Sequence, residues 1–318
     1  MDHKGRRSRP LIGFLVATVC VFGAARAAEG PLRAMRWMAP GANHLQTLGE
    51  RPAECLMRPD TRDSAYSVEV GRAAFRTPLL LGGQAARAGV ACETCHKGGH
   101  TNPDFLFPGV SGAPGTADVT NSLFSSHRGD GVDNPKPIPD LGGPRARLKV
   151  SQDPRGRALE SFIHGLVTEE FDGPEPTPAV LDGLADYVRH LQPQSCPRKA
   201  IETVVAGAYI GDARRAVTAA SRAFARKDHA TAAFLASAGR AQLGLLYERY
   251  DTPSLAADRA NLQAADRELA MAAEAARKGD PRTSRLLNAW LGRSLAWGAQ
   301  LQRDEPRSLF NVKRLAGV

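Results

Sequence analysis

The sequence has few of the patterns that usually identify a binding or catalytic site. It contains five cysteines but a single Cys-x-x-Cys pair, so two such pairs cannot supply four thiolates to one zinc ion. It has no EF-hand pattern. Residues 197–318 contain no motif typical of metal binding, phosphate binding or a catalytic nucleophile, and no repeat of the 34-residue helical kind. These absences leave one short motif to define the chemistry of the chain.

The N-terminus, residues 1–27, has the pattern of a secretory signal peptide. Basic residues precede an apolar run over 11–24, and an Ala-Arg-Ala sequence at 25–27 provides a cleavage site. The run is short for a membrane span, although an uncleaved anchor is the alternative. Arg6-Arg7 also suggests twin-arginine export. Pro10 and the absence of the residues that complete the twin-arginine pattern favour the general secretion route. We therefore expect a periplasmic protein, in a compartment where disulfides form.

The motif that defines the chemistry is Cys92-Glu93-Thr94-Cys95-His96. Cys92 and Cys95 can lie on one side of a helical turn, where both thiols reach the vinyl groups of one porphyrin edge. His96 can then offer its imidazole to the iron. A thioredoxin-like pair or half of a zinc site are the alternatives, but a redox pair has no need of the histidine. The spacing is typical of c-type haem attachment, which predicts one covalent haem c.

The remaining cysteines predict a disulfide. Cys20 leaves with the signal peptide, and haem attachment uses Cys92 and Cys95. Cys55 and Cys196 are then the two thiols left in an oxidising compartment, so we expect them to pair. Such a bridge closes a loop of about 140 residues and is expected to stabilise the fold by about 4 kcal/mol in the chain-entropy model.

Two helices are predicted on either side of the motif. The first, near residues 67–75, places Gly71 and Phe75 on one face. The second covers 178–191 with apolar residues at helical spacing, and begins at a proline that follows a capping Thr177. At this point the chain resembles the cytochrome c fold, in which an N-terminal helix with a glycine crosses a C-terminal helix with an aromatic residue beside haem.

A long stretch rich in Gly and Pro, residues 97–147, separates the motif from the second helix. A loop of this length needs an organiser inside a compact domain, and a buried porphyrin is the expected one. The apolar wall expected around it consists of Phe105, Leu106, Phe107, Val110, Leu123 and Phe124.

The order of short motifs narrows the resemblance to one haem domain of the dihaem cytochrome c peroxidase and methylamine-utilisation cytochrome superfamily. The chain departs from that family in three ways. It has one haem motif, Phe162 stands where the Leu-Glu-x-Gln segment of the peroxidatic site has glutamine, and a helical C-terminal part is added. The motifs that carry the resemblance are Gly71 to Phe75, Gly89, Cys92 to His96, Asn121-Ser122-Leu123, Asp130-Gly131 and Leu159-Glu160.

The sequence identifies the sixth iron ligand less clearly than the proximal ligand, His96. No methionine lies between Met57 and Met271, so the usual downstream methionine ligand is absent. His127, in a polar turn rich in Ser and Gly, is the first candidate, and His164 is the second. The remaining options are Met57, Met38 or an open, water-bound position, because His100 is too near Cys95 to reach the opposite haem face and His190 is expected to be exposed.

Acidic residues after His164 are the candidates for proton transfer. By family position, Glu169 and Glu170, with Asp172 close behind, form the carboxylate cluster that peroxide chemistry would use, although such a cluster is more often a solvated loop. Asp130, Asp133 and Asn134 are weak calcium candidates by the same resemblance.

Composition divides the chain into parts. We expect an N-terminal extension at 28–64, a cytochrome c-like haem domain at 65–196 and an Ala- and Arg-rich helical bundle at 197–318, hence an all-α protein. Residues 28–196 carry 17 basic and 20 acidic residues, whereas 197–318 carry 20 and 12. The basic part could meet an acidic or haem-bearing redox partner or an anionic membrane surface, or could simply be a solvated helical surface. A periplasmic location makes nucleic acid an unexpected partner.

The bundle is predicted to contain four helices with short connections. The first covers about 201–227, with an interruption possible at Gly211. Asp228 caps a second helix that reaches Tyr250. The third extends from Thr252-Pro253 to Gly279, and the fourth from Asp280-Pro281 to about Arg303, with Trp290 and Trp297 expected in the core.

These features predict a periplasmic monohaem c-type cytochrome that passes single electrons to or from a protein partner. A peroxidase-like enzyme, or an accessory subunit that borrows a second haem, is the alternative. A haem-based ligand sensor is the third possibility. The missing glutamine and the missing second haem motif favour electron transfer.

Overall fold

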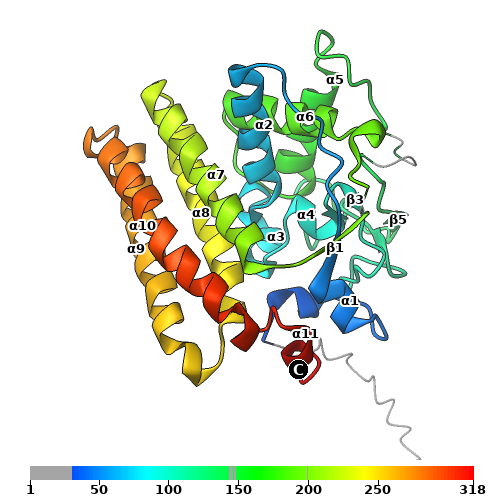
Figure 1. The fold of residues 1–318 in the computed structure, drawn as a ribbon. Coiled ribbons are helices and arrows are strands. Elements are labelled where there is room, and N and C mark those ends of the chain that lie inside the picture. Colours follow the sequence, from blue (N-terminus) through cyan, green and yellow to red (C-terminus); the bar gives the residue numbers. More distant parts are fainter. Residues whose placement is uncertain (1–30, 143–145, 147, 199) are drawn as a thin grey trace, which may run out of the picture.

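The computed structural model describes residues 31–142, 146, 148–198 and 200–318. Helices dominate these residues, and the strands form two-stranded pieces of two or three residues each, which confirms the all-α class (Figure 1). The predicted signal peptide lies outside the described residues. Among the residues described, no helix is both long enough and apolar enough to cross a membrane.

The part before residue 197 combines short helices with long loops. A π-helical turn at residues 166–170 directly continues the helix at residues 158–165. The elements are η1 (Arg33–Trp37), α1 (His44–Gly49), β1 (Glu50–Pro52), α2 (Arg62–Phe75), η2 (Pro78–Leu80), α3 (Gly83–Ala88), α4 (Cys92–Cys95), β2 (His96–Lys97), β3 (His100–Thr101), β4 (Thr116–Ala117), β5 (Lys136–Pro137), α5 (Ala158–Gly165), η3 (Leu166–Glu170), α6 (Pro178–His190) and η4 (Pro193–Ser195).

Helices α2 and α6 form the scaffold of this part, and they cross in close contact. A Cβ atom built on Gly71 of α2 would lie 1.8 Å from the carbonyl oxygen of Gly183 on α6. Thr177 caps α6 as predicted, because its side chain accepts from Val180 N. Helix α2 begins at Arg62, earlier than the predicted start, since Thr61 rather than a later residue caps it.

The loops between α4 and α5 are organised by aromatic side chains. Phe107 stacks on Trp37 with ring centroids 4.1 Å apart, and Phe124 lies 4.8 Å from Phe107 and 5.4 Å from Phe171. Phe124 is buried, whereas Leu123, which was expected in the same apolar wall, is 44% exposed. Aromatic side chains of the Gly- and Pro-rich stretch therefore pack into the hydrophobic cluster, and Trp37 of the N-terminal extension packs against them.

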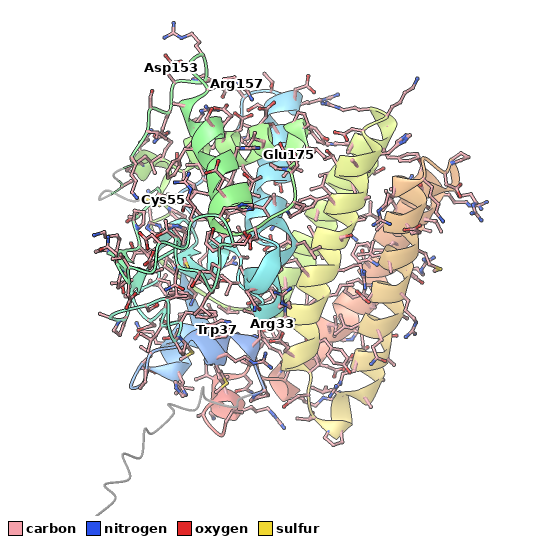
Figure 2. The ribbon with its side chains drawn as sticks, turned by 180° about the vertical axis from the view of Figure 1, so that it is seen from behind. Arg33, Trp37, Cys55, Asp153, Arg157 and Glu175 are labelled. Atoms are coloured by element: carbon pink, nitrogen blue, oxygen red, sulfur yellow. A yellow bond between two sulfur atoms is a disulfide. The ribbon has the colours of Figure 1, made fainter. Side chains whose placement is uncertain are left out.

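The last 120 or so residues form an antiparallel helical bundle, on one side of the molecule in both views (Figure 1, Figure 2). Asp228 caps α8 as predicted, and Trp290 is fully buried, with its indole nitrogen donating to Ala265 O at 3.0 Å. The helices are α7 (Ala206–Ala225), α8 (His229–Arg249), α9 (Ala256–Arg277) and α10 (Arg282–Asp304), with η5 (Pro253–Leu255), η6 (Glu305–Arg307) and α11 (Val312–Leu315).

The start of the first bundle helix was predicted wrongly. Residues Ile201–Thr203 form strand β6, which pairs antiparallel with β1 (Glu50–Pro52). Helix α7 begins only at Ala206 and passes through Gly211 without interruption. A partner 150 residues away in the sequence decides the strand, which no local helical periodicity could indicate.

The two parts of the chain share one hydrophobic core. Helix α2 packs against α7 and α8, and buried residues of both parts belong to one continuous cluster. The N-terminal extension contacts both parts, since β1 pairs with β6 and α1 packs on α11. The segment expected to be a separate extension thus connects the beginning and the end of the molecule.

Candidate functional site

The two thiols of the central motif lie on one helical turn, α4 (Cys92–Cys95). Thr94 Oγ1 accepts from Ala91 N at 3.0 Å, which fixes the start of the turn. Asn102 fixes its end, because its side-chain nitrogen donates to Thr94 O at 2.9 Å and its backbone nitrogen to Cys95 O at 2.9 Å. Both cysteines are free and partly exposed. The turn therefore presents two thiols on a fixed backbone.

His96 follows directly, and its ring is oriented by the backbone of a distant loop. Nδ1 lies 3.0 Å from Pro139 O, so Nδ1 is the protonated nitrogen and Nε2 keeps a free lone pair. Burial lowers the pKa of His96 to about 4, with Pro139 and Asp140 opposing, so the imidazole is neutral at neutral pH. Metal-binding histidines commonly have this second hydrogen bond, which fixes tautomer and orientation.

The environment of the thiols argues against a thioredoxin-like pair. Burial raises the pKa of Cys92 to about 12 and that of Cys95 to about 12. Catalytic dithiols depend on the opposite shift, since the thiolate is the nucleophile. Their surroundings favour the neutral thiol over the thiolate.

The side chains of the motif are not gathered around one point. Within the described ranges, no three His, Cys, Asp or Glu side chains converge as they would around one metal ion. Cys92, Cys95 and His96 are adjacent but do not share a point of convergence. A c-type haem needs donors that are separated in this way, because the sulfurs bond the porphyrin edge while the imidazole binds at its centre. Two thiols and one imidazole are the residue types that c-type haem attachment uses.

The two candidate distal histidines lie in a polar region with carboxylate neighbours. His127 has a side chain 63% exposed, and its Nε2 lies 3.8 Å from Asp172 Oδ1. His164 is 38% exposed, with Nε2 2.9 Å from Glu175 Oε2. In the part of the chain that the structure describes, no hydrogen bond or ring contact joins either imidazole to His96. Their role as iron ligands stays a prediction, and ligation through Nε2 would require each to leave its carboxylate.

The carboxylates expected near a reactive iron occupy the π-helical turn η3, and their environments differ. A hydrogen bond from Arg128, together with its charge, lowers the pKa of Glu169, which is exposed. Burial raises the pKa of Glu170. Asp172 accepts from Ser126 N at 2.9 Å, which fastens the turn that bears His127 to the end of η3. Of the two neighbours, only Glu170 is in an environment that favours holding a proton.

The calcium candidates are engaged in turn formation. Asp130 accepts from Val132 N at 2.8 Å, and Asn134 N donates to Asp118 Oδ2 at 2.9 Å. The described residues hold no group of three acidic or other ligating side chains at this place. Calcium binding by Asp130, Asp133 and Asn134 stays a prediction that no contact supports.

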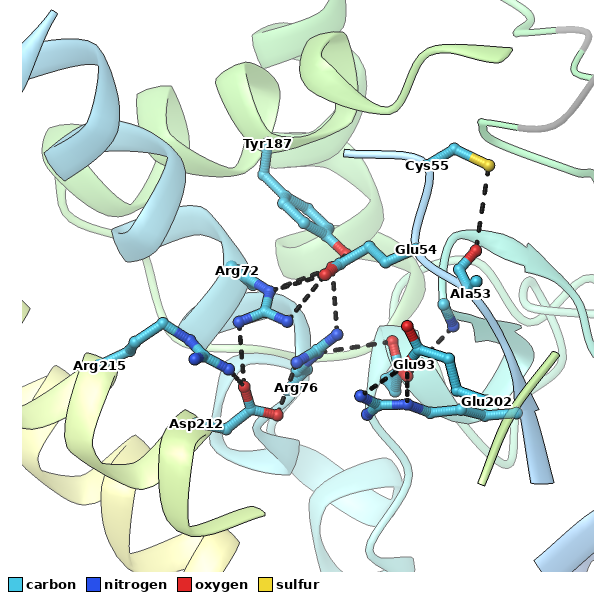
Figure 3. Close-up of polar contacts among 12 residues, drawn as sticks. Ala53, Glu54, Cys55, Arg72, Arg76, Glu93, Tyr187, Glu202, Asp212 and Arg215 are labelled. Carbon is cyan, nitrogen blue, oxygen red and sulfur yellow. Dashed lines mark hydrogen bonds and ion pairs between the residues drawn. The ribbon is translucent and has the colours of Figure 1, made fainter. Parts of the chain in front are cut away.

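The structure adds a buried ionic cluster that sequence reasoning missed (Figure 3). Glu54 accepts from Arg72 Nη2 at 2.7 Å and from Arg76 Nη2 at 3.0 Å. Asp212 of α7 accepts from Arg72 Nη1 at 3.0 Å and from Arg76 Nη1 at 2.6 Å. Glu93, inside the central motif, lies 3.8 Å from Arg76 Nε. The spacing of the two arginines, one turn apart on α2, was the available signal.

Two of the three carboxylates in this cluster, Glu54 and Asp212, are held ionised, whereas burial raises the pKa of Glu93. Burial raises the pKa of Glu54, but Arg76 and Arg72 outweigh it and bring that pKa to about 2. Burial likewise raises the pKa of Asp212, and Arg76, Arg72 and Arg215 bring it to about 2. The cluster thus joins the N-terminal extension, α2 and the bundle by charge as well as by packing.

The predicted disulfide is present. Cys55 Sγ and Cys196 Sγ lie 2.02 Å apart, and 141 residues separate the two in sequence. Cys55 follows β1, and Cys196 follows η4 at the end of the first part. Figure 2 shows Cys55 on the side of the molecule away from the bundle.

Comparison of the chain with protein-family models, curated proteins and solved structures gives no match. The resemblance drawn from the order of short motifs therefore has no independent support. What this protein does has to be argued from the site itself.

Proposed function

We propose that this protein is a monohaem c-type cytochrome that transfers single electrons to or from a protein partner. One observation carries the proposal: His96 donates from Nδ1 to Pro139 O and so offers Nε2, directly beside two thiols on one helical turn. When bound, haem c supplies a one-electron iron couple within the protein.

Each residue of the motif has a separate task in this proposal. Cys92 and Cys95 would hold haem through thioethers, and His96 would supply an imidazole to its iron. The carbonyl of Pro139 keeps the imidazole in the tautomer and orientation that ligation needs. The lowered pKa of His96 removes competition between a proton and the iron at neutral pH.

The proposal includes the fold of residues 65–196 as a cytochrome c-like domain. The close crossing of α2 and α6 at Gly71 and Gly183 supports it, as does the position of the Phe75 ring, 6.4 Å from the His96 ring. The periplasmic location follows from the predicted signal peptide, and haem attachment requires such a compartment.

The charge distribution suggests the kind of redox partner. Residues 197–318 carry an excess of eight basic residues, whereas 28–196 carry an excess of three acidic ones. An acidic or haem-bearing protein would be steered toward the bundle side, so electron transfer should slow as salt rises. An anionic membrane surface would be attracted by the same charge.

The test is expression of the full chain in a bacterium that exports it and attaches haem c. We expect a mass increase of one haem, retained in acidified acetone, and an alkaline pyridine spectrum of the two-thioether type. Cys92→Ala and Cys95→Ala should each retain at most one thioether, while the matched control Cys55→Ala should keep both. Free thiols at both Cys92 and Cys95 in the exported protein would reject the proposal.

A peroxidase-like enzyme is the second candidate, because Glu170 combines a raised pKa with a place in a π-helical turn. Such turns are frequent at functional sites, and a protonated carboxyl could donate a proton to peroxide. Electron paramagnetic resonance of the ferric protein separates the candidates. Low-spin iron that does not react with peroxide supports electron transfer. High-spin iron that reacts with peroxide, and loses that reaction in Glu170→Gln but not in Glu169→Gln, supports the enzyme.

The same spectra test the distal ligand. If His127 binds the iron, His127→Ala should convert low-spin to high-spin iron, whereas His164→Ala should leave the spectrum unchanged. The reverse result would assign His164.

A further inference from the structure

The Cys55–Cys196 disulfide lies beside a histidine, and a carboxylate lies on the far side of that histidine ring. His100 Nε2 is 3.6 Å from Cys55 Sγ, and His100 Nδ1 is 3.3 Å from Asp140 Oδ1. The carboxylate therefore orients the ring from one nitrogen, and the other nitrogen faces the sulfur. This is the order of groups, carboxylate then imidazole then sulfur, that activates thiols in enzymes.

The two sulfurs differ in their access to solvent. Cys196 is exposed, whereas Cys55 is 2% exposed. A pocket of about 770 Å³ is lined by both cysteines together with His100 and Asp140. An incoming thiol can thus reach the disulfide from the pocket and meets Cys196 as the accessible sulfur.

Opening the disulfide would not separate the segments it joins. Gln192 N donates to Cys55 O at 2.8 Å, and Met57 N donates to His190 O at 2.7 Å. On the other side, Ala53 N donates to the carbonyl of residue 200 at 2.8 Å. These backbone hydrogen bonds hold the two sulfurs close in the reduced state, so the bond can form again.

We propose that Cys55–Cys196 is a redox-active disulfide that exchanges with an external thiol or dithiol, with His100 as its acid–base group. An external thiolate attacks Cys196 Sγ, and a new S–S bond forms there as the bond to Cys55 breaks. Cys55 Sγ leaves with the electron pair and takes a proton from protonated His100. A second external thiolate attacks the incoming sulfur and releases Cys196 as a thiolate, which solvent protonates.

The step is balanced. Two external thiols are oxidised to one disulfide, and the protein disulfide gains two electrons and two protons. An external disulfide reverses the sequence, with His100 accepting the proton of Cys55. The activity is independent of haem and does not rest on the proposed cytochrome function.

The test follows reduction of the folded full-length protein by dithiothreitol without denaturant. Acid quenching, alkylation and peptide mass spectrometry report Cys55 and Cys196 separately. We expect His100→Gln to slow reduction about tenfold, because the leaving thiolate loses its proton donor. The matched control His44→Gln, at an exposed histidine of α1, should reduce at the wild-type rate.

The pH dependence gives a readout that a purely structural His100 would not affect. The quantity compared is the rate of disulfide reduction divided by the concentration of dithiothreitol thiolate. In the wild-type protein this quantity should fall as the pH rises and histidine loses its proton. In His100→Gln it should not change with pH. Within the part of the chain that the structure describes, Asp140 and Cys55 face His100. Lys97, on the paired strand β2, directs its ammonium to two backbone carbonyls elsewhere.

Trapping with glutathione identifies the attacked sulfur. The mixed disulfide is expected on Cys196. Equal rates in His100→Gln and His44→Gln would overturn the proposal, as would a mixed disulfide on Cys55 or a bond reducible only in denaturant. A parallel unfolding curve confirms that His100→Gln is folded, so a slow rate is assigned to the exchange step.

Discussion

Single residues decide how closely elements of this protein can approach, and Gly71 is the clearest case. Its position on α2 faces the backbone of α6, where a Cβ atom would meet Gly183 O at 1.8 Å and Leu184 N at 2.7 Å. Backbone atoms cannot move aside as a flexible side chain can. The glycine therefore permits the crossing that brings Phe75 and Tyr187 into contact, with ring centroids 5.1 Å apart.

Gly71→Ala should lower the free energy of unfolding by about 3 kcal/mol, because the helices must separate to accept the methyl group. Urea unfolding followed by circular dichroism measures it. The control is Gly292→Ala on α10, where no atom lies within 4 Å of the added carbon. That change should be neutral or stabilising by up to about 1 kcal/mol. Equal losses in both variants would contradict the explanation.

At the scale of elements, charge connects α2 to its neighbours. Arg76 is 7% exposed and Asp212 is 8% exposed, so the pair is out of water. Tyr187 of α6 donates to Glu54, which adds a third element to the contact. A buried cluster of this kind depends on completeness, since removal of one partner leaves an uncompensated charge.

The cluster predicts sensitivity to acid. The pKa of Glu54 falls from 4.5 to about 2 in the folded protein, and that of Asp212 from 3.8 to about 2. A depressed folded-state pKa gives stability that is complete above the unfolded value and lost as pH falls toward the folded one. The free energy of unfolding should therefore decline between pH 5 and about pH 2, as measured by urea titrations at each pH.

The variant Asp212→Asn tests the same cluster. It should lower the free energy of unfolding by about 3 kcal/mol at pH 7 and weaken the decline below pH 5. The exposed Asp60 provides the matched control, since Asp60→Asn should change neither. An Asp212→Asn protein with the wild-type acid profile would show that the cluster does not govern it.

At the scale of the whole molecule, segments that are far apart in the sequence are joined to one another. Strand β1 pairs with β6, α1 packs on α11, and the disulfide joins residues 141 positions apart. The disulfide restricts the unfolded chain more than the folded one, because backbone hydrogen bonds already hold Cys55 beside its partner segment.

The double variant Cys55→Ser/Cys196→Ser should lose about 4 kcal/mol of unfolding free energy, as expected for a loop of this length. Guanidinium unfolding measures the loss. Cys55→Ser alone should lose as much, since neither variant can form the bridge. A loss below about 1 kcal/mol would mean that the unfolded chain is already compact, or that strain offsets the gain.

The sequence by itself determined what depends on short spacing or on counting. The Cys92–His96 motif, the caps at Thr177 and Asp228, and the bundle helices are local patterns, so neighbours in sequence define them. The pairing of Cys55 with Cys196 followed from elimination among five cysteines.

Only the tertiary structure decided which distant groups meet. Pro139 lies 43 residues from the histidine whose tautomer it sets, and Asp212 lies 136 residues from Arg76. Ile201–Thr203 became a strand because β1 was beside it, and Glu169 and Glu170 received opposite pKa shifts from different surroundings. Hydrogen bonding, desolvation and charge pairing act over a few ångströms in space, and separation along the chain does not reveal them.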